Sequence, residues 1–461
     1  MKRENPLPGP PPLRGRGGPV LSVLGVVGVL GVLSCSKPEP PRNVILILVD
    51  TLRADHLGAY GYARPTSPNV DAFAAESLRF SGSRSQASCT FPSANSILTS
   101  RYPSAFLGQP APSPLGIPES VPSLAEILQQ RGFRTAAVSA SPVVRSTPGR
   151  FNPGAGFGRG FESFDEDCEW RNAACVNRAA IPLIRSGDQR PFFLYLHYMD
   201  PHGPYTPPKN HKRRWALGRP EKKFVRDGNP NPIGEMLYNG GPDPGATPAD
   251  LQYLIDLYDE EIAFFDAQLA GLLKALRDAG RMEDTAVVLV SDHGEEFLEH
   301  GHIKHCRTLF DSSIKTPFLL HLPGMEARVL DQPVQNLDVV PTVLDYLGVD
   351  TKGLTFEGES LRPLIEETGD LDPHQYGMQG TLRSAADGRH KLIHDLGKGS
   401  YALYDLKADP KEKKDALSAD RRIFHRLRQA LTTWLGRTEG TGKAEESLEA
   451  ERKLRALGYL E

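Results

Sequence analysis

Three residues that can bind a metal ion follow two apolar segments lying far apart in the sequence. The run 43–49, rich in Val, Ile and Leu, is followed at once by Asp50, and the run 286–291 by Asp292 and His293. Short apolar runs of this kind predict strands that are buried on both faces. Polar groups at the carboxyl ends of such strands lie where open α/β sheets bind their ligands. We therefore predict one metal site that both segments share.

A hydroxyl that can act as a nucleophile stands at the start of a predicted helix. Thr90 belongs to the segment Ser88-Cys-Thr-Phe-Pro-Ser93, and a helical pattern follows it as far as Thr99. A hydroxyl in this position either caps the helix or attacks a substrate. The second interpretation requires an anionic substrate, because the helix N-terminus presents free N–H groups and a positive dipole.

Titratable and cationic side chains follow two of the apolar runs. His202 comes just after the run 191–198, at the same predicted level as the strand-end aspartates. His305 and Arg307 belong to the segment 299–307, which follows the Asp-His pair and is rich in His, Lys and Arg. Such a segment either forms a solvated loop or binds an oxyanion, and its position favours the oxyanion.

The elements that position these residues alternate between strand and helix patterns. Apolar runs predict strands at 43–49, 134–140, 191–198, 286–291 and 317–322, and amphipathic patterns predict helices at 123–132, 247–280 and 337–347. This alternation predicts an α/β fold, a large central, mostly parallel sheet sandwiched by helices, over residues 43–352. Segment 142–190 has no clear period and is interpreted as an insertion over the sheet edge. Residues 353–461 are predicted to form a smaller C-terminal α+β subdomain and a charged tail.

Composition and the N-terminus indicate an exported globular protein. The chain has 461 residues and a formal net charge of −3, which argues against a nucleic-acid partner. Basic residues, an apolar run and Cys35 make residues 1–35 a signal peptide, with Val32-Leu-Ser-Cys35 similar to a bacterial lipobox. Residues 36–42 are then a tether, and a lipid anchor would attach the protein to a bacterial membrane. A secretory signal, releasing a periplasmic or secreted protein, and a signal anchor are the alternatives.

Two further sequence features bear on the site. The four cysteines after Cys35 are able to form disulfides in an exported protein, either within 168–175 or between Cys89 and Cys306, and the sequence does not decide the pairing. The segment 209–226 carries eight Lys and Arg residues. It is interpreted as a solvated loop or as a rim that attracts an anionic substrate.

Together these segments resemble the sulfatase family of the alkaline-phosphatase superfamily. The resemblance covers nearly all of the chain after the signal peptide, and its motifs are Val49–Gly58, Thr66–Asp71, His197–His202, Ser291–Glu296 and Leu403–Pro410. It implies that Asp50, Asp292 and His293 hold one divalent cation. Calcium is usual in sulfatases, and manganese and zinc are the alternatives. A second metal-binding Asp that many sulfatases carry is replaced by Thr51.

The nucleophile position departs from the family pattern. Sulfatases use a Cys or Ser, two residues before a Pro and four before an Arg, that is oxidised to formylglycine. Here these positions hold Thr90, Pro92 and Ala94. Threonine cannot become formylglycine, so we expect none and place the chain in a subgroup with Thr at the nucleophile position. The Lys and His that follow the next strand in sulfatases are also missing, and Ser139–Pro142 stands in their place.

The resemblance and its departures predict a metal-dependent enzyme that cleaves a sulfuric or phosphoric ester. The cation would lower the pKa of the Thr90 hydroxyl, which would attack the sulfuryl or phosphoryl centre in line. His202, His305 and Arg307 would neutralise the ester oxygens or protonate the leaving group. The substrate is expected to be an anionic small-molecule or glycan ester. A phosphoesterase, a phosphonate hydrolase, a phosphotransferase and a catalytically weak protein that binds an anionic glycan are the alternatives.

Overall fold

A computed structural model describes most of the chain after the signal peptide. The described residues are Gly9, 40–107, 116–170, 172–208, His211, 213–217 and 247–438. Apart from Gly9, the predicted signal peptide with Cys35 lies outside them, as do residues 36–39 of the tether, most of the basic segment 209–226 and the tail beyond 438. Within the described residues, no helix has both the length and the apolar character needed to cross a bilayer.

An eight-stranded sheet forms the centre of the fold, in the order β10-β2-β9-β6-β1-β5-β3-β4. All neighbouring strands are parallel except that β9 runs antiparallel to β2 and to β6. This confirms the predicted large, mostly parallel sheet. Its strands are β1 (Asn43–Val49), β2 (Leu78–Arg84), β3 (Arg134–Ser139), β4 (Ser163–Asp165), β5 (Phe192–Tyr198), β6 (Thr285–Ser291), β9 (Phe318–His321) and β10 (Arg328–Gln335).

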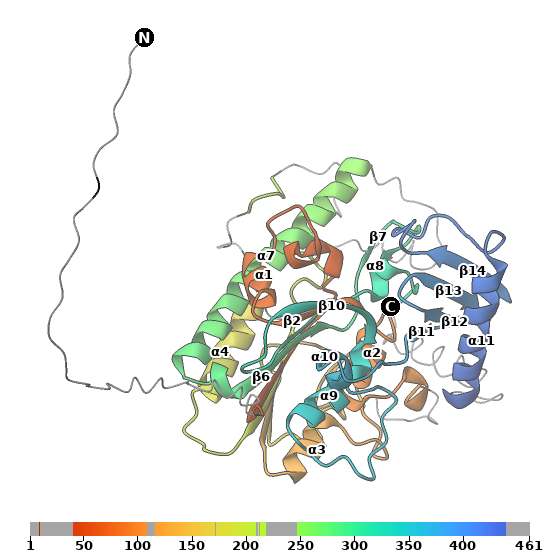
Figure 1. Ribbon diagram of the computed structural model, residues 1–461. Helices are drawn as coiled ribbons and strands as arrows, with labels where there is room; N and C mark the ends of the chain where they lie inside the picture. The colour runs from red at the N-terminus through yellow and green to blue at the C-terminus, as the bar shows by residue number, and fades with distance from the viewer. Residues whose placement is uncertain are drawn as a thin grey trace. The chain divides into compact units, whose positions relative to one another are not determined.

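Helices cover both faces of this sheet because alternate residues of each central strand point to opposite sides. The first face of β1, with Leu46, packs against α2 (Thr90–Thr99), α3 (Leu124–Gln130), α9 (Val339–Tyr346) and α10 (Arg362–Ile365). The second face, with Ile47, packs against α1 (Pro68–Ala74), α4 (Ala173–Ile184) and α7 (Pro248–Asp278). Figure 1 shows the two helical layers with the sheet between them. The predicted sandwich is confirmed.

Helix starts were predicted well and the peripheral strands were not. Ser123 caps α3 and Thr247 caps α7, each in a capping box. The segment 142–190, interpreted as an insertion, instead contributes the edge strand β4 and helix α4, which packs on the sheet. That prediction was wrong because β4 has three residues, none of them buried, and α4 contains Pro182, so neither shows a regular apolar period.

The C-terminal part has its own antiparallel sheet, β11 (Gln375–Gln379), β12 (Leu382–Ala386), β13 (His390–Asp395) and β14 (Ser400–Asp405). Helix α11 (Arg421–Thr438) packs on it through Ile423, Leu427, Leu431 and Trp434. This confirms the smaller α+β part. The short helix α10 still belongs to the core of the large sheet, so the C-terminal sheet begins with β11.

Candidate active site

The strand register brings the predicted metal ligands to the same edge of the sheet. The Cα of Val49 in β1 is level with that of Ser291 in β6, so the residues that follow, Asp50 and Asp292, are adjacent. The N–H of Asp50 donates to the carbonyl of Tyr198 at the end of β5 (2.9 Å). Thr51 then adopts a left-handed conformation with φ of 56°, which is rare for a β-branched residue and turns the chain away from the sheet.

Each aspartate uses one carboxylate oxygen for the protein and leaves the other without a hydrogen bond. Asp50 Oδ2 lies 3.2 Å from Nε2 of His197, and Asp292 Oδ1 accepts from the N–H groups of Thr51 (3.2 Å) and His293 (2.9 Å). Asp50 Oδ1 and Asp292 Oδ2 are buried and have no hydrogen-bond partner among the described residues. Because buried carboxylate oxygens are costly to leave unsatisfied, this pair fits a bound cation.

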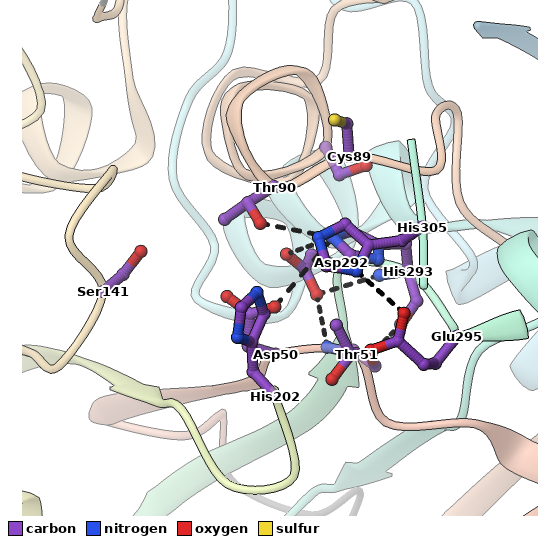
Figure 2. Close-up of polar contacts among 12 residues, drawn as sticks. Asp50, Thr51, Cys89, Thr90, Ser141, His202, Asp292, His293, Glu295 and His305 are labelled. Carbon is purple, nitrogen blue, oxygen red and sulfur yellow. Dashed lines mark hydrogen bonds and ion pairs between the residues drawn. The ribbon is translucent and has the colours of Figure 1, made fainter. Parts of the chain in front are cut away.

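His293 and Thr90 direct two further donor atoms at the same point. His293 Nδ1 lies 2.9 Å from the carbonyl oxygen of Gly294, which can only accept, so Nδ1 carries the proton and Nε2 of the neutral ring has the lone pair. That Nε2 lies 3.2 Å from Thr90 Oγ1, 3.4 Å from Asp292 Oδ2 and 3.9 Å from Asp50 Oδ1. Figure 2 shows the Thr90 hydroxyl directed at His293. Two oxygens of carboxylates, one hydroxyl and one imidazole nitrogen thus converge.

His197 also belongs to the site. It begins the sequence motif His197–His202, but it was not among the predicted metal ligands. Asp50, His197 and Asp292 offer ligand atoms within 4.8 Å of one another, so His197 is an alternative fourth ligand. Its Nε2 faces the oxygen of Asp50 opposite the unpartnered one, and its Nδ1 lies 2.9 Å from the Tyr195 hydroxyl. We favour a supporting role, in which His197 holds Asp50 in orientation. The one sequence feature that could have identified His197 is that a polar residue stands within the otherwise apolar run of β5, at a fully buried position.

The two aspartates differ in how their surroundings shift their pKa values. Burial raises the pKa of Asp292 to about 6, and the nearby charge of Asp50 adds to this effect. Burial would also raise the pKa of Asp50, but His202, His197 and His293 lower it well below its usual range overall. Two carboxylates this close to each other repel, and a cation between them would relieve that repulsion.

His202 and His305 lie side by side and, with Asp50 and Thr90, line a narrow cavity that is called the Thr90 cavity below. Their ring centroids are 5.0 Å apart, and the His305 ring is 4.6 Å from that of His293. His305 Nδ1 donates to Glu295 Oε1 (2.9 Å), and the hydroxyl of Tyr205 donates to Glu295 Oε2 (2.9 Å). Burial would raise the pKa of Glu295, but the charge of His305 and its hydrogen bond lower it overall. Glu295 therefore fixes the orientation of the His305 ring.

A cavity of about 70 Å³ contains Asp50, Thr90, His202 and His305. It is narrow, and among its described lining residues no lysine or arginine occurs, so the two histidines are the groups that can carry positive charge there. A wider cleft of about 690 Å³ shares three lining residues with it: Trp170, Met199 and His202. Ser141, from the segment that replaces the family's Lys and His, also lines the narrow cavity and lies apart from the charged cluster (Figure 2).

Arg307 is not among the described residues that line the Thr90 cavity. It lines a separate cavity of about 530 Å³, together with His302 and Lys398, against the C-terminal sheet. The structure therefore brings Thr90, His202, His305, Asp50, Asp292 and His293 together, and it places Arg307 on another surface of the same segment.

Two disulfides connect the four cysteines that follow the signal peptide. One joins Cys89 to Cys306, and the other joins Cys168 to Cys175. Both of the pairs proposed from the sequence are present. Cys89 and Cys306 lie in the wall of the Thr90 cavity.

Comparison with known families and proteins gives a consistent result. The family model "Sulfatase" matches residues 42–349, and "N-sulphoglucosamine sulphohydrolase, C-terminal" matches residues 298–437. Human N-sulphoglucosamine sulphohydrolase is 27% identical over 391 residues, 77% of this chain and 74% of that protein. An arylsulfatase of Clostridium perfringens is 23% identical over 471 residues, 86% of this chain and 95% of that protein.

Solved structures share the fold at lower sequence identity. BT4656, solved in complex with its substrate D-glucosamine-2-N,6-O-disulfate, superposes with a TM-score of 0.71 at 18% identity and covers 88% of this chain and 100% of that one. A phosphonate monoester hydrolase of Agrobacterium radiobacter superposes with a TM-score of 0.65 at 19% identity, covering 90% of this chain and 95% of that one. At these identities the comparison establishes the fold.

Proposed function

The chain belongs to the sulfatase family, and we propose that it hydrolyses an anionic ester with Thr90 as nucleophile and one divalent cation as cofactor. One observation carries the proposal: Thr90 Oγ1 lies 3.2 Å from His293 Nε2, which in turn lies 3.4 Å and 3.9 Å from the unpartnered carboxylate oxygens of Asp292 and Asp50. A catalytically weak glycan-binding protein has no evident need for such a set of buried donor atoms.

The donor set bears on which cation is bound. Asp50, Asp292, His293 and Thr90 would supply three oxygens and one imidazole nitrogen. Calcium prefers six to eight oxygen ligands, whereas zinc and manganese accept imidazole together with carboxylates. We therefore favour zinc or manganese over the calcium that is usual in the family.

The proposed reaction has two displacement steps. The bound cation would lower the pKa of the Thr90 hydroxyl and offset negative charge on the ester. Thr90 Oγ1, after releasing its proton to water, would form a bond to the sulfur or phosphorus while the bond from that atom to the alcohol oxygen breaks. His305, oriented by Glu295, gives the proton to the departing alcohol. Water would then attack the sulfur or phosphorus of the ester on Thr90 and give a proton back to His305. The bond to Thr90 Oγ1 would break, which restores the deprotonated Thr90 and releases the acid.

His202 is proposed to hold the non-bridging oxygens of the ester. Burial lowers its pKa, and Asp50 partly offsets this effect. An anionic ester beside the ring would favour its protonated form, because a nearby negative charge stabilises the imidazolium. With His305 it would replace the lysine and arginine that the family pattern supplies.

The surroundings of Thr90 argue against formylglycine. Threonine has no route to the aldehyde, and the neighbouring Cys89 is bonded to Cys306 rather than present as a free thiol. Without a hydrated aldehyde, release of the product requires attack of water on an ester of Thr90. Phosphoryl and phosphonyl transfer to a hydroxyl nucleophile fits this chemistry well, and the likeness in fold to a phosphonate monoester hydrolase favours the same substrates as a second candidate.

The alcohol part of the ester would occupy the wider cleft beside Trp170. Several relatives carry names that refer to sulfated sugars, and BT4656 was solved with a disulfated glucosamine, so an anionic glycan ester is a fitting substrate class. We also propose that Cys35 carries a lipid that anchors the protein to a bacterial membrane, on the sequence evidence alone. Detergent partitioning of the wild type and of Cys35→Ala would test this anchor.

The experiment that tests the function is a substrate panel. Purified protein with zinc, manganese or calcium would be assayed against aryl sulfate, aryl phosphate, phosphodiester and phosphonate esters, with Thr90→Ser and Thr90→Ala as matched variants. We expect turnover of at least one ester, partial activity in Thr90→Ser and a loss of about 1,000-fold or more in Thr90→Ala. Equal activity in Thr90→Ala and the wild type would contradict the proposal.

A further inference from the structure

We propose that the disulfide between Cys89 and Cys306 is a positioning device that holds His305 at a fixed place relative to Thr90. The inference rests on the proposed roles of these two residues. Cys89 directly precedes Thr90, and Cys306 directly follows His305, so one covalent bond joins segments that are 217 residues apart in the sequence. Both cysteines line the cavity that contains the two reactive groups.

The segment that carries His305 has little regular structure to hold it. It leaves a hairpin of β7 (Glu296–Phe297) and β8 (Ile303–Lys304), with two residues in each strand. A hairpin this short contributes little stability by itself. Lys304 and Cys306, on either side of His305, both have positive φ values, 68° and 66°. Residues other than glycine hold this conformation when their surroundings impose it.

The disulfide is the strongest of the contacts that impose this conformation. The N–H of Cys306 donates to the carbonyl of Ser88 (2.7 Å), and Gln379 donates to the carbonyl of Cys306 (3.1 Å). The hydrogen bond to Ser88 and the disulfide to Cys89 attach residue 306 to consecutive residues just before the nucleophile. Glu295 sets the rotation of the His305 ring, whereas the bridge sets its distance from Thr90.

The second disulfide does not join segments that carry reactive groups. Cys168 and Cys175 are 7 residues apart and close a local loop, and neither is adjacent in sequence to a reactive group. If a disulfide acted on this protein through stability alone, the loss of either bridge would have the same kind of effect on catalysis. A positioning role predicts a specific effect of the Cys89–Cys306 bridge on proton donation by His305.

The test compares Cys89→Ala/Cys306→Ala with the control Leu427→Ala. Leu427 is a buried residue of α11. Its truncation to Ala should lower the stability of the fold without changing a contact in the Thr90 cavity. For each variant kcat, KM and the melting temperature would be measured on an aryl ester and on an alkyl ester of the same acid. The alkyl ester has the poorer leaving group and depends more on a proton donor.

We expect kcat of the Cys89→Ala/Cys306→Ala variant to fall about 10- to 100-fold on the alkyl ester, since small misplacements of a catalytic group cost this much. The fall on the aryl ester should be clearly smaller and KM nearly unchanged. Leu427→Ala should lower the melting temperature with equal, small effects on both esters. The same ratio of alkyl to aryl activity in the bridge variant and the wild type would overturn the proposal.

Two further variants separate this inference from the proposed function. If Thr90→Ala and His305→Gln lose activity while the bridge variant keeps the wild-type ratio, the positioning role alone is wrong. If Thr90→Ala keeps full activity, the proposed function is wrong, and the bridge then has no catalytic pair to position. A bridge variant that shares the leaving-group dependence of His305→Gln would support the inference.

Discussion

Two cavities lie on either side of the segment 302–307, and they differ in charge and enclosure. The first, around Thr90, is narrow and is lined by the buried carboxylate of Asp50 together with His202 and His305. The second, beside Arg307, is larger and lies against the C-terminal sheet, where Lys398 is 81% exposed. The unpartnered oxygen of Asp50 belongs to the first cavity, and the exposed Lys398 belongs to the second. A cation-rich segment close to a metal site in the sequence therefore does not by itself supply cations to that site.

The backbone at Cys306 explains this separation. Residues two apart in an extended strand point to the same side, so His305 and Arg307 would be expected to share a surface. Cys306 has a φ of 66°, which interrupts the extended geometry between them. His305 consequently lines the Thr90 cavity and Arg307 the other one.

The largest expected effect of a change at the metal site comes from Asp292→Asn. It removes a charged ligand and should reduce kcat/KM by about 1,000-fold or more, because the cation offsets charge in the transition state. Titration of the metal-free protein with zinc or manganese should show greatly weakened binding. Asp345→Asn, at a partly exposed position that does not line the Thr90 cavity, serves as the control and should bind metal as the wild type does. Full metal affinity in Asp292→Asn would assign the site to other residues.

Loss of the proton donor should have the next largest effect. His305→Gln keeps a hydrogen-bonding side chain near Glu295 but cannot transfer a proton, so we expect kcat to fall about 100-fold on an ester with a poor leaving group. The effect should shrink on a 4-nitrophenyl ester, which can depart without a proton. An equal loss on both esters would assign His305 a role in binding the ester instead.

The affinity for the metal should decrease moderately as the pH is lowered. Burial and the charge of Asp50 raise the pKa of Asp292 to about 6, so a proton occupies this carboxylate below that pH in the metal-free protein. A cation must then displace the proton, and its affinity should fall by about tenfold for each pH unit below 6. Calorimetric titrations between pH 5 and 8 would measure this, and an affinity that stays constant below pH 6 would contradict it.

Arg307→Gln is expected to have the smallest effect. Because Arg307 lines the other cavity, its loss should change kcat/KM on a small aryl ester by less than about threefold at physiological ionic strength, where charges outside the site are screened. The conservative variant Arg307→Lys gives the baseline. A loss as large as that of His305→Gln would show that Arg307 reaches the ester and that the two cavities act as one site.

The sequence predicted those parts of the site that follow strand ends. Asp50, Asp292 and His293 were selected because an apolar run that stops at an acidic residue marks the edge where parallel strands meet, and the structure places the three residues close together. His197 was missed because it lies inside such a run, where its role depends on which residues of β1 it faces. Glu295 was missed because its partner His305 comes from beyond a hairpin and the pair forms in three dimensions.

The fold was likewise predicted in part: the central strands were predicted, and some strands nearer the edge were not. The central strands β1, β5 and β6 are wholly buried and mostly apolar, so their patterns were sufficient. The strands β2 and β10 were not predicted, since partly exposed positions interrupt their apolar pattern. Pairing between distant edge strands depends on the assembled sheet rather than on local composition.

The central claim is that Thr90 carries the group transferred from the substrate. The most direct measurement is mass spectrometry of the peptide containing Cys89 and Thr90, after the metal-loaded protein has turned over an ester and been quenched in acid. The account predicts one sulfuryl or phosphoryl group on Thr90 in the wild type, and none in the corresponding peptide of Thr90→Ala. An unmodified Thr90 during steady turnover, or an aldehyde at Cys89, would contradict it.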